Sequence, residues 1–433
     1  MTRLTRCSIA FDSTPRPLRR GAGRATIRSV PSLRGRVGLP ALVLATTLIA
    51  TSCGAAGHVG APTPSVGQSP SSTTTPPTTS PPVGCVGRVL SGMTEAQRVG
   101  QLFMVGLRGG VLQPATAAAF RAHHFGSATF ISTTTAGVDG VLAVTDAVQA
   151  LASQQSTAGV RFFVSANQEG GEVQALQGPG FSIMPPATQQ GMLPPPSLRH
   201  LAFEWGRQMR AAGVNLNLAP VMDVVPLATA SQNQPIGALH REFGYDPVTV
   251  ASHGVAFIHG MTDAGIATTA KHFPGLGRVV GNTDFTANVV DRATTATDPF
   301  LASFRAAIAA GVPFVMVSLA TYARIDPSHL AVFSPTIIQT MLRDRFGFRG
   351  VVVSDDLGAA IAVAGIPPGT RAIEFLEAGG DLITSKTVPA AVAMDRAVLL
   401  RARADGAFRA VIDAAATRIL TSKERFGLLP CSD

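Results

Sequence analysis

The stretch GFRGVVVSDDL (347–357) holds one step of a repeating pattern of helices and strands. The helix expected before it begins at Ser334-Pro335, an N-cap residue followed by proline at the first helical position. The glycine that opens the stretch lies where a helix C-cap is favoured, and the apolar run VVVS follows as a short buried strand. Two carboxylates, Asp355 and Asp356, come directly after this strand. The stretch therefore predicts the helix-to-strand step of a parallel α/β fold.

Short apolar runs of this kind occur eight times in the globular part, separated by segments with helical periodicity. Eight strands that alternate with helices are the number that closes a (β/α)8, TIM-like barrel. We therefore expect an α/β fold with a single barrel domain over residues 85–433. Trp205 falls on the apolar stripe of a helix expected from Ser197, so we expect it in the core. The predicted strands are Leu102–Val105, Ala128–Ser132, Phe162–Ser165, Asn215–Ala219, Ala267–Ala270, Phe314–Ser318, Val351–Ser354 and Leu382–Thr384.

Polar side chains stand at the ends of several of these strands. In a (β/α)8 barrel, residues just past the C-terminal ends of the strands face one shared site. Adjacent carboxylates and a Lys-His pair are poor choices for structural turns alone, so their recurrence predicts one polyhydroxylated ligand held from several sides. The candidates are Asn167 and Glu169 after the third strand, Asp223 after the fourth, Lys271 and His272 after the fifth, and Asp355 and Asp356 after the seventh.

Five motifs resemble those of glycoside hydrolase family 3, in particular the single-domain, NagZ-like β-N-acetylglucosaminidases of bacteria and the LpqI-type lipoproteins of mycobacteria. They occur in the family's order and cover essentially the whole globular part. The resemblance implies a cofactor-free, exo-acting, retaining β-N-acetylglucosaminidase that removes terminal N-acetylglucosamine from peptidoglycan fragments of the cell wall. The motifs are NQEGG (167–171), APVMDV (219–224), REFGYDP (241–247), KHFPGLG (271–277) and GFRGVVVSDDL (347–357).

The resemblance also implies that Asp355 is the catalytic nucleophile. The chemistry agrees, because a carboxylate at a strand end can attack the anomeric carbon and form a covalent glycosyl-enzyme. Water then hydrolyses this intermediate with net retention of configuration. The alternative is that Asp356 attacks and Asp355 orients it.

The same resemblance places Asn167, Arg241, Lys271 and His272 at sugar-binding positions. Arg241 could instead form a salt bridge that supports a loop, and His272 could be a buried, satisfied histidine. Asn167 stands where the family has an aspartate, so it can bind a hydroxyl only without charge assistance. This departure leaves the sugar less defined than the reaction.

The proton donor departs from the family pattern. Related one-domain enzymes carry Asp-Ser-His on a loop after KHFPG, with the histidine as acid/base, whereas the corresponding residues here are Asn282-Thr283-Asp284. A carboxylic acid can transfer the same protons where nearby charge and exclusion of water favour its protonated form. We therefore predict Asp284 as the acid/base, with Asp291 in reserve; alternatively, Asp284 only caps a loop turn. An anionic base would repel phosphate, so hydrolysis should strongly outpace phosphorolysis.

Residues 1–52 have the layout of a secretory signal. They contain nine arginines and one aspartate, which account for nearly all of the net charge of +9, and the remainder shows no nucleic-acid footprint. An apolar run over 39–50 is too short to span a bilayer. Thr51-Ser52 before Cys53 resembles a lipobox, so we expect lipid on Cys53 and attachment to the outer face of the cytoplasmic membrane. The alternative is a plain cleaved signal peptide.

Residues 53–84 are rich in Pro, Ser and Thr and read as a semi-extended tether. Cys85 and Cys431 then flank the globular part. In an oxidising compartment they can pair, because a closed barrel places its first and last strands side by side. We expect this disulfide, and two free thiols are the alternative.

Several functional classes find little support in the sequence. There is no HExxH or CxxC pair, and His123-His124 lack spaced partners, so we expect no metal site. We expect a monomer whose partners are a carbohydrate and, through the anchor, the membrane. Two alternatives remain: a β-glucosidase or β-xylosidase of the same family, and a catalytically weak lipoprotein that binds wall glycan.

Overall fold

The computed structural model describes residues 84–431 except Gly110. The predicted signal segment, Cys53 and the tether up to residue 83 lie outside the described residues. Within the described part, no helix combines the length and the apolar character needed to cross a membrane.

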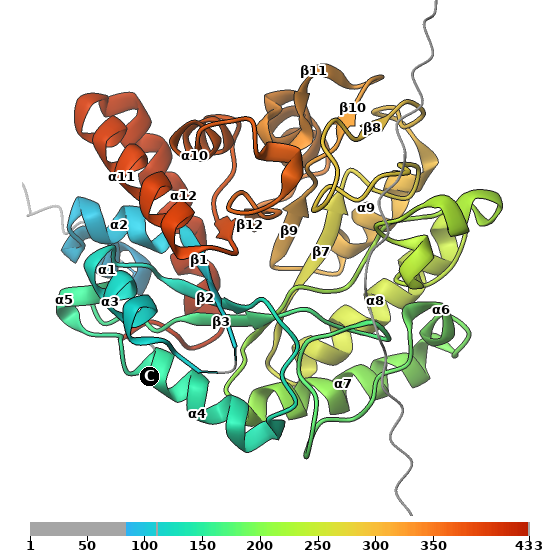
Figure 1. Cartoon of the computed structure of the whole chain (residues 1–433), viewed down its shortest axis with the longest axis horizontal. Helices are drawn as coiled ribbons and strands as arrows, with labels where there is room; N and C mark the ends of the chain where they lie inside the picture. Colours follow the sequence, from blue (N-terminus) through green and yellow to red (C-terminus); the bar gives the residue numbers. More distant parts are fainter. Residues whose placement is uncertain (1–83, 110, 432–433) are drawn as a thin grey trace, which may run out of the picture. The chain divides into compact units, whose positions relative to one another are not determined.

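Eight parallel strands form a closed barrel, as the sequence predicts (Figure 1). A bridge between Val353 and Leu382 joins the two outer strands of the sheet, β12 and β13, and completes the ring. Asp381, next to that bridge, donates its backbone N–H to the Val352 carbonyl, which continues the closure. In order around the barrel, the strands are β12 (Val351–Ser354), β9 (Phe314–Val317), β7 (Ala267–Phe273), β6 (Leu216–Asn217), β3 (Phe163–Ala166), β2 (Ser127–Phe130), β1 (Phe103–Leu107) and β13 (Ile383–Ser385).

Strand β7 departs most from the prediction. The apolar run ends at Ala270, but the strand continues to Phe273, which pairs with Val317 of β9 after a register shift. Lys271 and His272 therefore belong to the strand itself, and their positions are set by the barrel rather than by a loop.

Helices cover the outside of the barrel, and α7 and α8 lie side by side (Figure 1). Trp205 of α7 is buried and packs near Phe257 of α8, which confirms its predicted place in the core. Before β12, the Ser334 hydroxyl accepts a hydrogen bond from the backbone N–H of Ile337, as expected of a residue that caps a helix. The helices are α1 (Cys85–Gly92), α2 (Glu95–Gln101), α3 (Pro114–Ala122), α4 (Gly137–Gln149), α5 (Gln154–Thr157), α6 (Ala187–Gln190), α7 (Pro195–Ala211), α8 (Pro247–Asp263), α9 (Ala302–Ala309), η5 (Thr336–Arg345), α10 (Pro368–Glu377), α11 (Val388–Ala404) and α12 (Gly406–Arg425), with shorter turns η1 (Leu227–Gln232), η2 (Gly237–Leu239), η3 (Pro299–Leu301), η4 (Ala331–Phe333) and η6 (Ile361–Val363).

Two small sheets lie at the C-terminal ends of the barrel strands. A hairpin follows β3, and a three-stranded sheet lies beyond β7. The hairpin consists of β4 (Gln168–Gly170) and β5 (Val173–Gln174), and the second sheet of β8 (Val290–Asp291), β10 (Thr321–Tyr322) and β11 (Asp326–Leu330).

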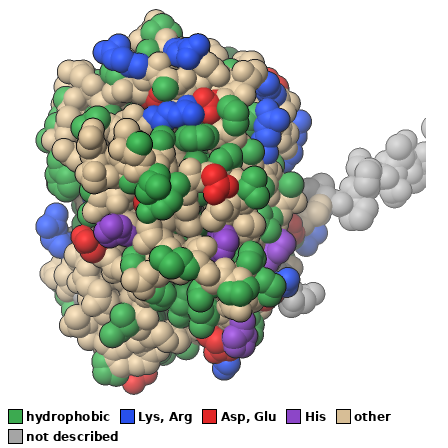
Figure 2. Space-filling view, turned by 90° about the vertical axis from the view of Figure 1, so that its right-hand side faces the viewer, with side chains coloured by type: hydrophobic (Ala, Val, Ile, Leu, Met, Phe, Trp, Pro, Cys, Tyr) green, Lys and Arg blue, Asp and Glu red, His purple; other side chains and the backbone are tan. Residues whose placement is uncertain are grey.

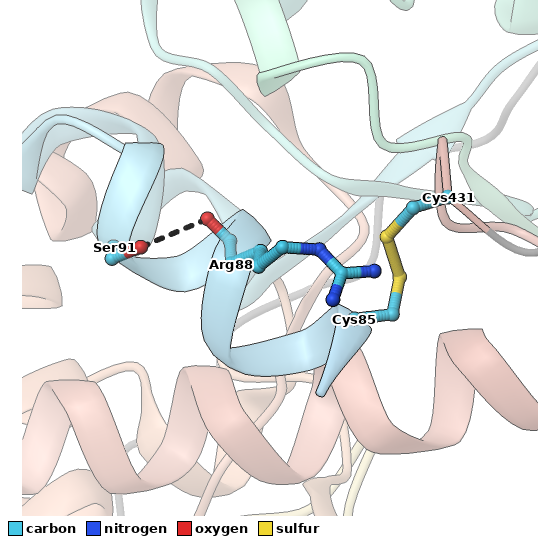
Figure 3. The surroundings of a disulfide bond; sticks show 4 residues. All are labelled: Cys85, Arg88, Ser91 and Cys431. Atoms are coloured by element: carbon cyan, nitrogen blue, oxygen red, sulfur yellow. Dashed lines mark hydrogen bonds between the residues drawn. A yellow bond between two sulfur atoms is a disulfide. The ribbon is translucent and has the colours of Figure 1, made fainter. Parts of the chain in front are cut away.

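The two ends of the described domain meet at a disulfide between Cys85 and Cys431, with their Cα atoms 6.0 Å apart (Figure 3). Both cysteines pack against a small apolar cluster that contains Val160. Arg161, two residues before β3, donates its backbone N–H to the Leu428 carbonyl. The disulfide therefore lies at the N-terminal ends of the strands, opposite the ends that carry the predicted site residues.

Charged side chains are dispersed over the face drawn in Figure 2. Lys and Arg form several separate groups there, some beside Asp or Glu, with uncharged surface between them. On that face the charge forms no continuous basic stripe of the kind that tracks a nucleic-acid backbone.

Candidate active site

A cavity of about 210 Å³ opens at the C-terminal ends of the barrel strands. It brings together all six residues that the sequence assigns to catalysis or sugar binding, although they come from five separate stretches of the chain. Lys386, which sequence reasoning did not single out, lines the same cavity. The six residues are Asn167, Arg241, Lys271, His272, Asp284 and Asp355.

A buried carboxylate, Glu169, organises one side of this cavity. Arg241 contacts both of its oxygens, with Nε and Nη2 each at 2.8 Å, and Lys271 Nζ lies 2.7 Å from Oε1. Lys271 also donates to the side-chain oxygen of Asn167 at 2.7 Å. Burial alone would raise the pKa of Glu169, but the charges of Arg241 and Lys271 outweigh it and lower that pKa to about 2. Glu169 therefore holds Arg241 and Lys271, two of the four predicted sugar-binding residues, and Asn167 is held through Lys271.

The glycines of NQEGG allow the chain to turn back after β3. Gly170 has a φ of 108° and Gly171 a φ of 57°, both in the region that favours glycine. A Cβ on Gly170 would lie only 2.3 Å from the Pro185 carbonyl oxygen. The tight β4–β5 hairpin therefore requires glycine, and it directs Glu169 inward as a buried residue.

His272 is held by the fully buried Asp223. One oxygen of Asp223 accepts from the backbone N–H groups of His272 and Leu276, at 3.1 and 2.8 Å, and the other lies 2.8 Å from His272 Nδ1. Because a carboxylate can only accept, Nδ1 carries the proton and Nε2 is the nitrogen left for a ligand. His272 is therefore a satisfied buried histidine that also lines the cavity, and its binding of a sugar stays a prediction.

Arg241 forms the loop-supporting salt bridge that was one interpretation of it, and its position at the cavity is compatible with the other, sugar binding. Its Nη1 donates to the Pro235 carbonyl at 2.7 Å, so the ion pair with Glu169 does tie down a loop. The same guanidinium borders the cavity. A group clamped from two sides presents its remaining surface to a ligand with little freedom to move.

The adjacent carboxylates Asp355 and Asp356 have different surroundings. Asp356 is 1% exposed and accepts from three backbone N–H groups, those of Gly358, Ala359 and Lys386. Burial raises the pKa of Asp356. Among the described residues, the carboxylate of Asp355 accepts only from the backbone N–H of Asp356, at 2.8 Å. Asp355 therefore has an oxygen available for attack, whereas Asp356 is occupied in holding the strand ends together.

The two acid/base candidates, Asp284 and Asp291, differ in their position and in their hydrogen bonds. Asp284 lies at the cavity, and both of its carboxylate oxygens are 3.0 Å from Lys386 Nζ. Asp291 is fully buried and accepts from the backbone N–H groups of Ala293 and Thr294, which makes it the turn cap. The oxygens of Asp291 are occupied and it does not line the cavity, so the structure favours Asp284 over this reserve candidate.

Lys386 could have been found by the reasoning that found Asp355. It directly follows β13, so it too stands at a strand end. The predicted run ended at Thr384, and the intervening Ser385 separated Lys386 from it. In the described part of the chain, no group of His, Cys, Asp and Glu side chains is arranged to hold a metal ion.

The chain is similar in sequence to several β-hexosaminidases. The enzyme of Stenotrophomonas maltophilia is 38% identical over 233 residues, and that of Xylella fastidiosa is 39% identical over 229 residues. Each alignment covers 51% of this chain and 65% of the relative, so the match spans just under two thirds of the relatives' length.

Solved structures match over a larger part of the chain. The β-N-acetylhexosaminidase of Beutenbergia cavernae is 48% identical, with a TM-score of 0.75 over 76% of this chain and 98% of that one. LpqI of M. tuberculosis is 26% identical, with a TM-score of 0.66 over 79% and 96% of the two chains. The model of the glycosyl hydrolase family 3 N-terminal domain matches residues 94–422, which are most of the chain and nearly all of the barrel. The chain therefore belongs to glycosyl hydrolase family 3, as its motifs predict.

Proposed function

We propose that this protein is an exo-acting, retaining β-N-acetylglucosaminidase that hydrolyses terminal N-acetylglucosamine from cell-wall peptidoglycan fragments. The observation that carries the proposal is the available carboxylate of Asp355 in the same cavity as Asn167, Arg241, Lys271 and His272. The β-hexosaminidases that align with the chain support the choice of sugar.

In the first half-reaction, protonated Asp284 gives its proton to the glycosidic oxygen. The bond from the anomeric carbon to that oxygen breaks as an oxygen of Asp355 bonds to the same carbon. In the second half-reaction, a water oxygen attacks the anomeric carbon and displaces Asp355. The proton of that water goes to Asp284, which is thereby ready for the next turnover.

The buried cluster around Glu169 supplies the sugar-binding groups. Lys271 and Arg241 are oriented before a ligand arrives, because Glu169 accepts from both. Such preorganised donors cost little reorganisation when they bind hydroxyl groups. Asn167, already bonded to Lys271, adds a neutral amide rather than a carboxylate at this corner.

The cellular setting is part of the proposal. A lipid on Cys53 would attach the monomeric enzyme to the outer face of the cytoplasmic membrane, and residues 54–84 would let it reach the wall. LpqI of M. tuberculosis has a similar barrel. Incorporation of labelled fatty acid into the wild type but not into Cys53→Ala tests the anchor.

Trapping the glycosyl-enzyme tests the nucleophile. The soluble form from Cys85 onward is treated with a 5-fluoro derivative of N-acetylglucosamine, digested and examined by peptide mass analysis. We expect the label on Asp355. Label on Asp356, or on any other residue, would overturn the assignment.

A panel of 4-nitrophenyl glycosides tests the substrate. We expect release from N-acetylglucosamine and little from glucose or xylose, and added phosphate should not accelerate turnover. Release from glucose alone would make the enzyme a β-glucosidase. Failure to release 4-nitrophenol from any sugar would favour a glycan-binding protein.

A further inference from the structure

Lys386 links the wall of the barrel to the loop that carries Asp284. Its backbone N–H donates to Asp356 at 2.9 Å, so its main chain is tied to the end of β12. Its Nζ contacts both oxygens of Asp284 at 3.0 Å and lies 4.0 Å from Asp356 Oδ2. The backbone of the loop is docked separately, since the Asp284 carbonyl accepts from Ile361 N–H.

Carboxylates keep Lys386 charged. Burial would lower the pKa of Lys386, but Asp284, Asp355 and Asp356 together raise it. The other cations of the cavity, Arg241 and Lys271, are paired with Glu169. Among the described residues, Lys386 is therefore the cation that contacts the predicted acid/base.

We propose that Lys386 is a positioning residue for both proton transfers. It holds the carboxylate of Asp284 at the cavity and stabilises the negative charge that develops there as the proton passes to the leaving group. The inference rests on the proposed role of Asp284 as the acid/base.

The contact with Lys386 stabilises the charged form of Asp284 more than its protonated form. Neutral Asp284 gains little from a nearby ammonium group, whereas the developing carboxylate gains a charge-assisted interaction at 3.0 Å. An interaction that strengthens only as the reaction proceeds lowers the barrier to chemistry. Leaving groups that depart without a proton need no such help, so the role of Lys386 should depend on the leaving group.

The experiment compares Lys386→Met with Lys386→Arg, which retains the charge. Two substrates are used: N,N′-diacetylchitobiose, whose leaving group must be protonated, and 2,4-dinitrophenyl N-acetylglucosaminide, whose leaving group need not be. For Lys386→Met we expect kcat/KM on chitobiose to fall by roughly 10- to 100-fold and on the dinitrophenyl substrate by less than about threefold. Lys386→Arg should stay within about fivefold of the wild type on both substrates.

A pH profile gives a second readout. The alkaline limb of kcat/KM reports loss of the proton from the catalytic acid. Removing a cation from beside this acid should move the limb to higher pH in Lys386→Met and leave it nearly unchanged in Lys386→Arg. The charged groups around the site are Asp284, Asp355 and Asp356, which face Lys386, and Arg241, Lys271 and His272 elsewhere on the cavity wall.

Equal losses on both substrates with an unmoved alkaline limb would show that Lys386 is only structural, and no loss at all would also overturn the inference. The same two substrates with Asp284→Asn separate the inference from the proposed function. If Asp284→Asn keeps its activity on chitobiose, the acid/base assignment itself fails. If Asp284→Asn shows the leaving-group dependence and Lys386→Met does not, only the role of Lys386 fails.

Discussion

The two ends of the barrel each bury a lysine, and the two lysines have different partners. At the C-terminal end, Lys271 Nζ lies 2.7 Å from Glu169 and donates to Asn167. At the N-terminal end, Lys423 Nζ donates to the Gln101 side chain at 2.7 Å and to the Gly126 carbonyl at 2.8 Å. Among the described residues, no carboxylate lies within ion-pair distance of Lys423, and burial lowers its pKa to about 7.

The difference shows that burial of a charged residue type does not by itself mark a functional site. Lys423 donates to two neutral oxygens, as a structural donor can. Lys271 belongs to a connected set of charges that borders a cavity. The two lysines are therefore distinguished by the groups that they contact, and not by how deeply they are buried.

Lys271→Met should give the largest effect. It removes a group that is proposed to bind the sugar, and it leaves the carboxylate of Glu169 with Arg241 as its remaining cation. We expect activity on N-acetylglucosaminides to fall by at least about 100-fold and the free energy of unfolding to drop by roughly 3–5 kcal/mol. Steady-state kinetics and urea unfolding measure the two quantities. A fully stable variant would contradict the idea that the cluster is a coupled unit.

Lys423→Met tests the buried lysine at the N-terminal end of the barrel. The pKa of this lysine is about 7 in the folded state against 10.5 in the unfolded state, so between these values the unfolded chain binds more protons. The unfolding free energy of the wild type, relative to the variant, should therefore rise by roughly 3–5 kcal/mol from pH 7 to pH 10.5. Urea unfolding at several pH values checks this difference, and activity should change little. A difference that does not vary with pH would show that Lys423 keeps its proton.

The lowered pKa of Glu169 predicts how the free energy of unfolding falls at acidic pH. Its pKa is lowered from 4.5 to about 2, so the folded state favours its charged form. This stabilisation is fully present above about pH 4.5 and is lost as the pH falls through about 2; it amounts to about 3 kcal/mol. Unfolding of the wild type and Glu169→Gln between pH 2 and 6 should show a flatter profile for the variant. Parallel profiles would contradict the prediction.

Lys386→Met should affect stability least. The side chains of Lys386 and Asp284 are each 35% exposed, and solvent screens such pairs. We expect a change in unfolding free energy within about 1 kcal/mol, far below that of Lys271→Met. Thermal unfolding of both variants under one condition makes the comparison, and a loss as large as that of Lys271→Met would place Lys386 in the structural core instead.

The barrel itself could be predicted from sequence, because each strand is a short apolar run bounded by helical periodicity. Strand ends also identified Asp355 and Lys271, since a barrel brings its C-terminal strand ends together. The extension of β7 to Phe273 was not predictable in this way, because Lys271 and His272 interrupt the apolar run although pairing with β9 continues at Phe273.

The pairing of side chains was harder to predict than their location. Glu169 was visible as one polar residue among several, but its central role depends on Arg241, which lies 72 positions away in the chain. The contact between Asp284 and Lys386 spans 102 positions and depends on how one loop folds over the barrel. Asp284 and Asp291 are both aspartates of that same segment, and only the turn geometry distinguishes the one at the cavity from the one that caps a turn.

The disulfide between Cys85 and Cys431 also has a consequence for orientation. It places the start of the barrel domain at the end opposite the cavity. A lipid on Cys53, if present as proposed, would therefore be joined to the barrel domain through the end that lacks the cavity. Asp355 and the other cavity residues lie at the opposite end of the barrel.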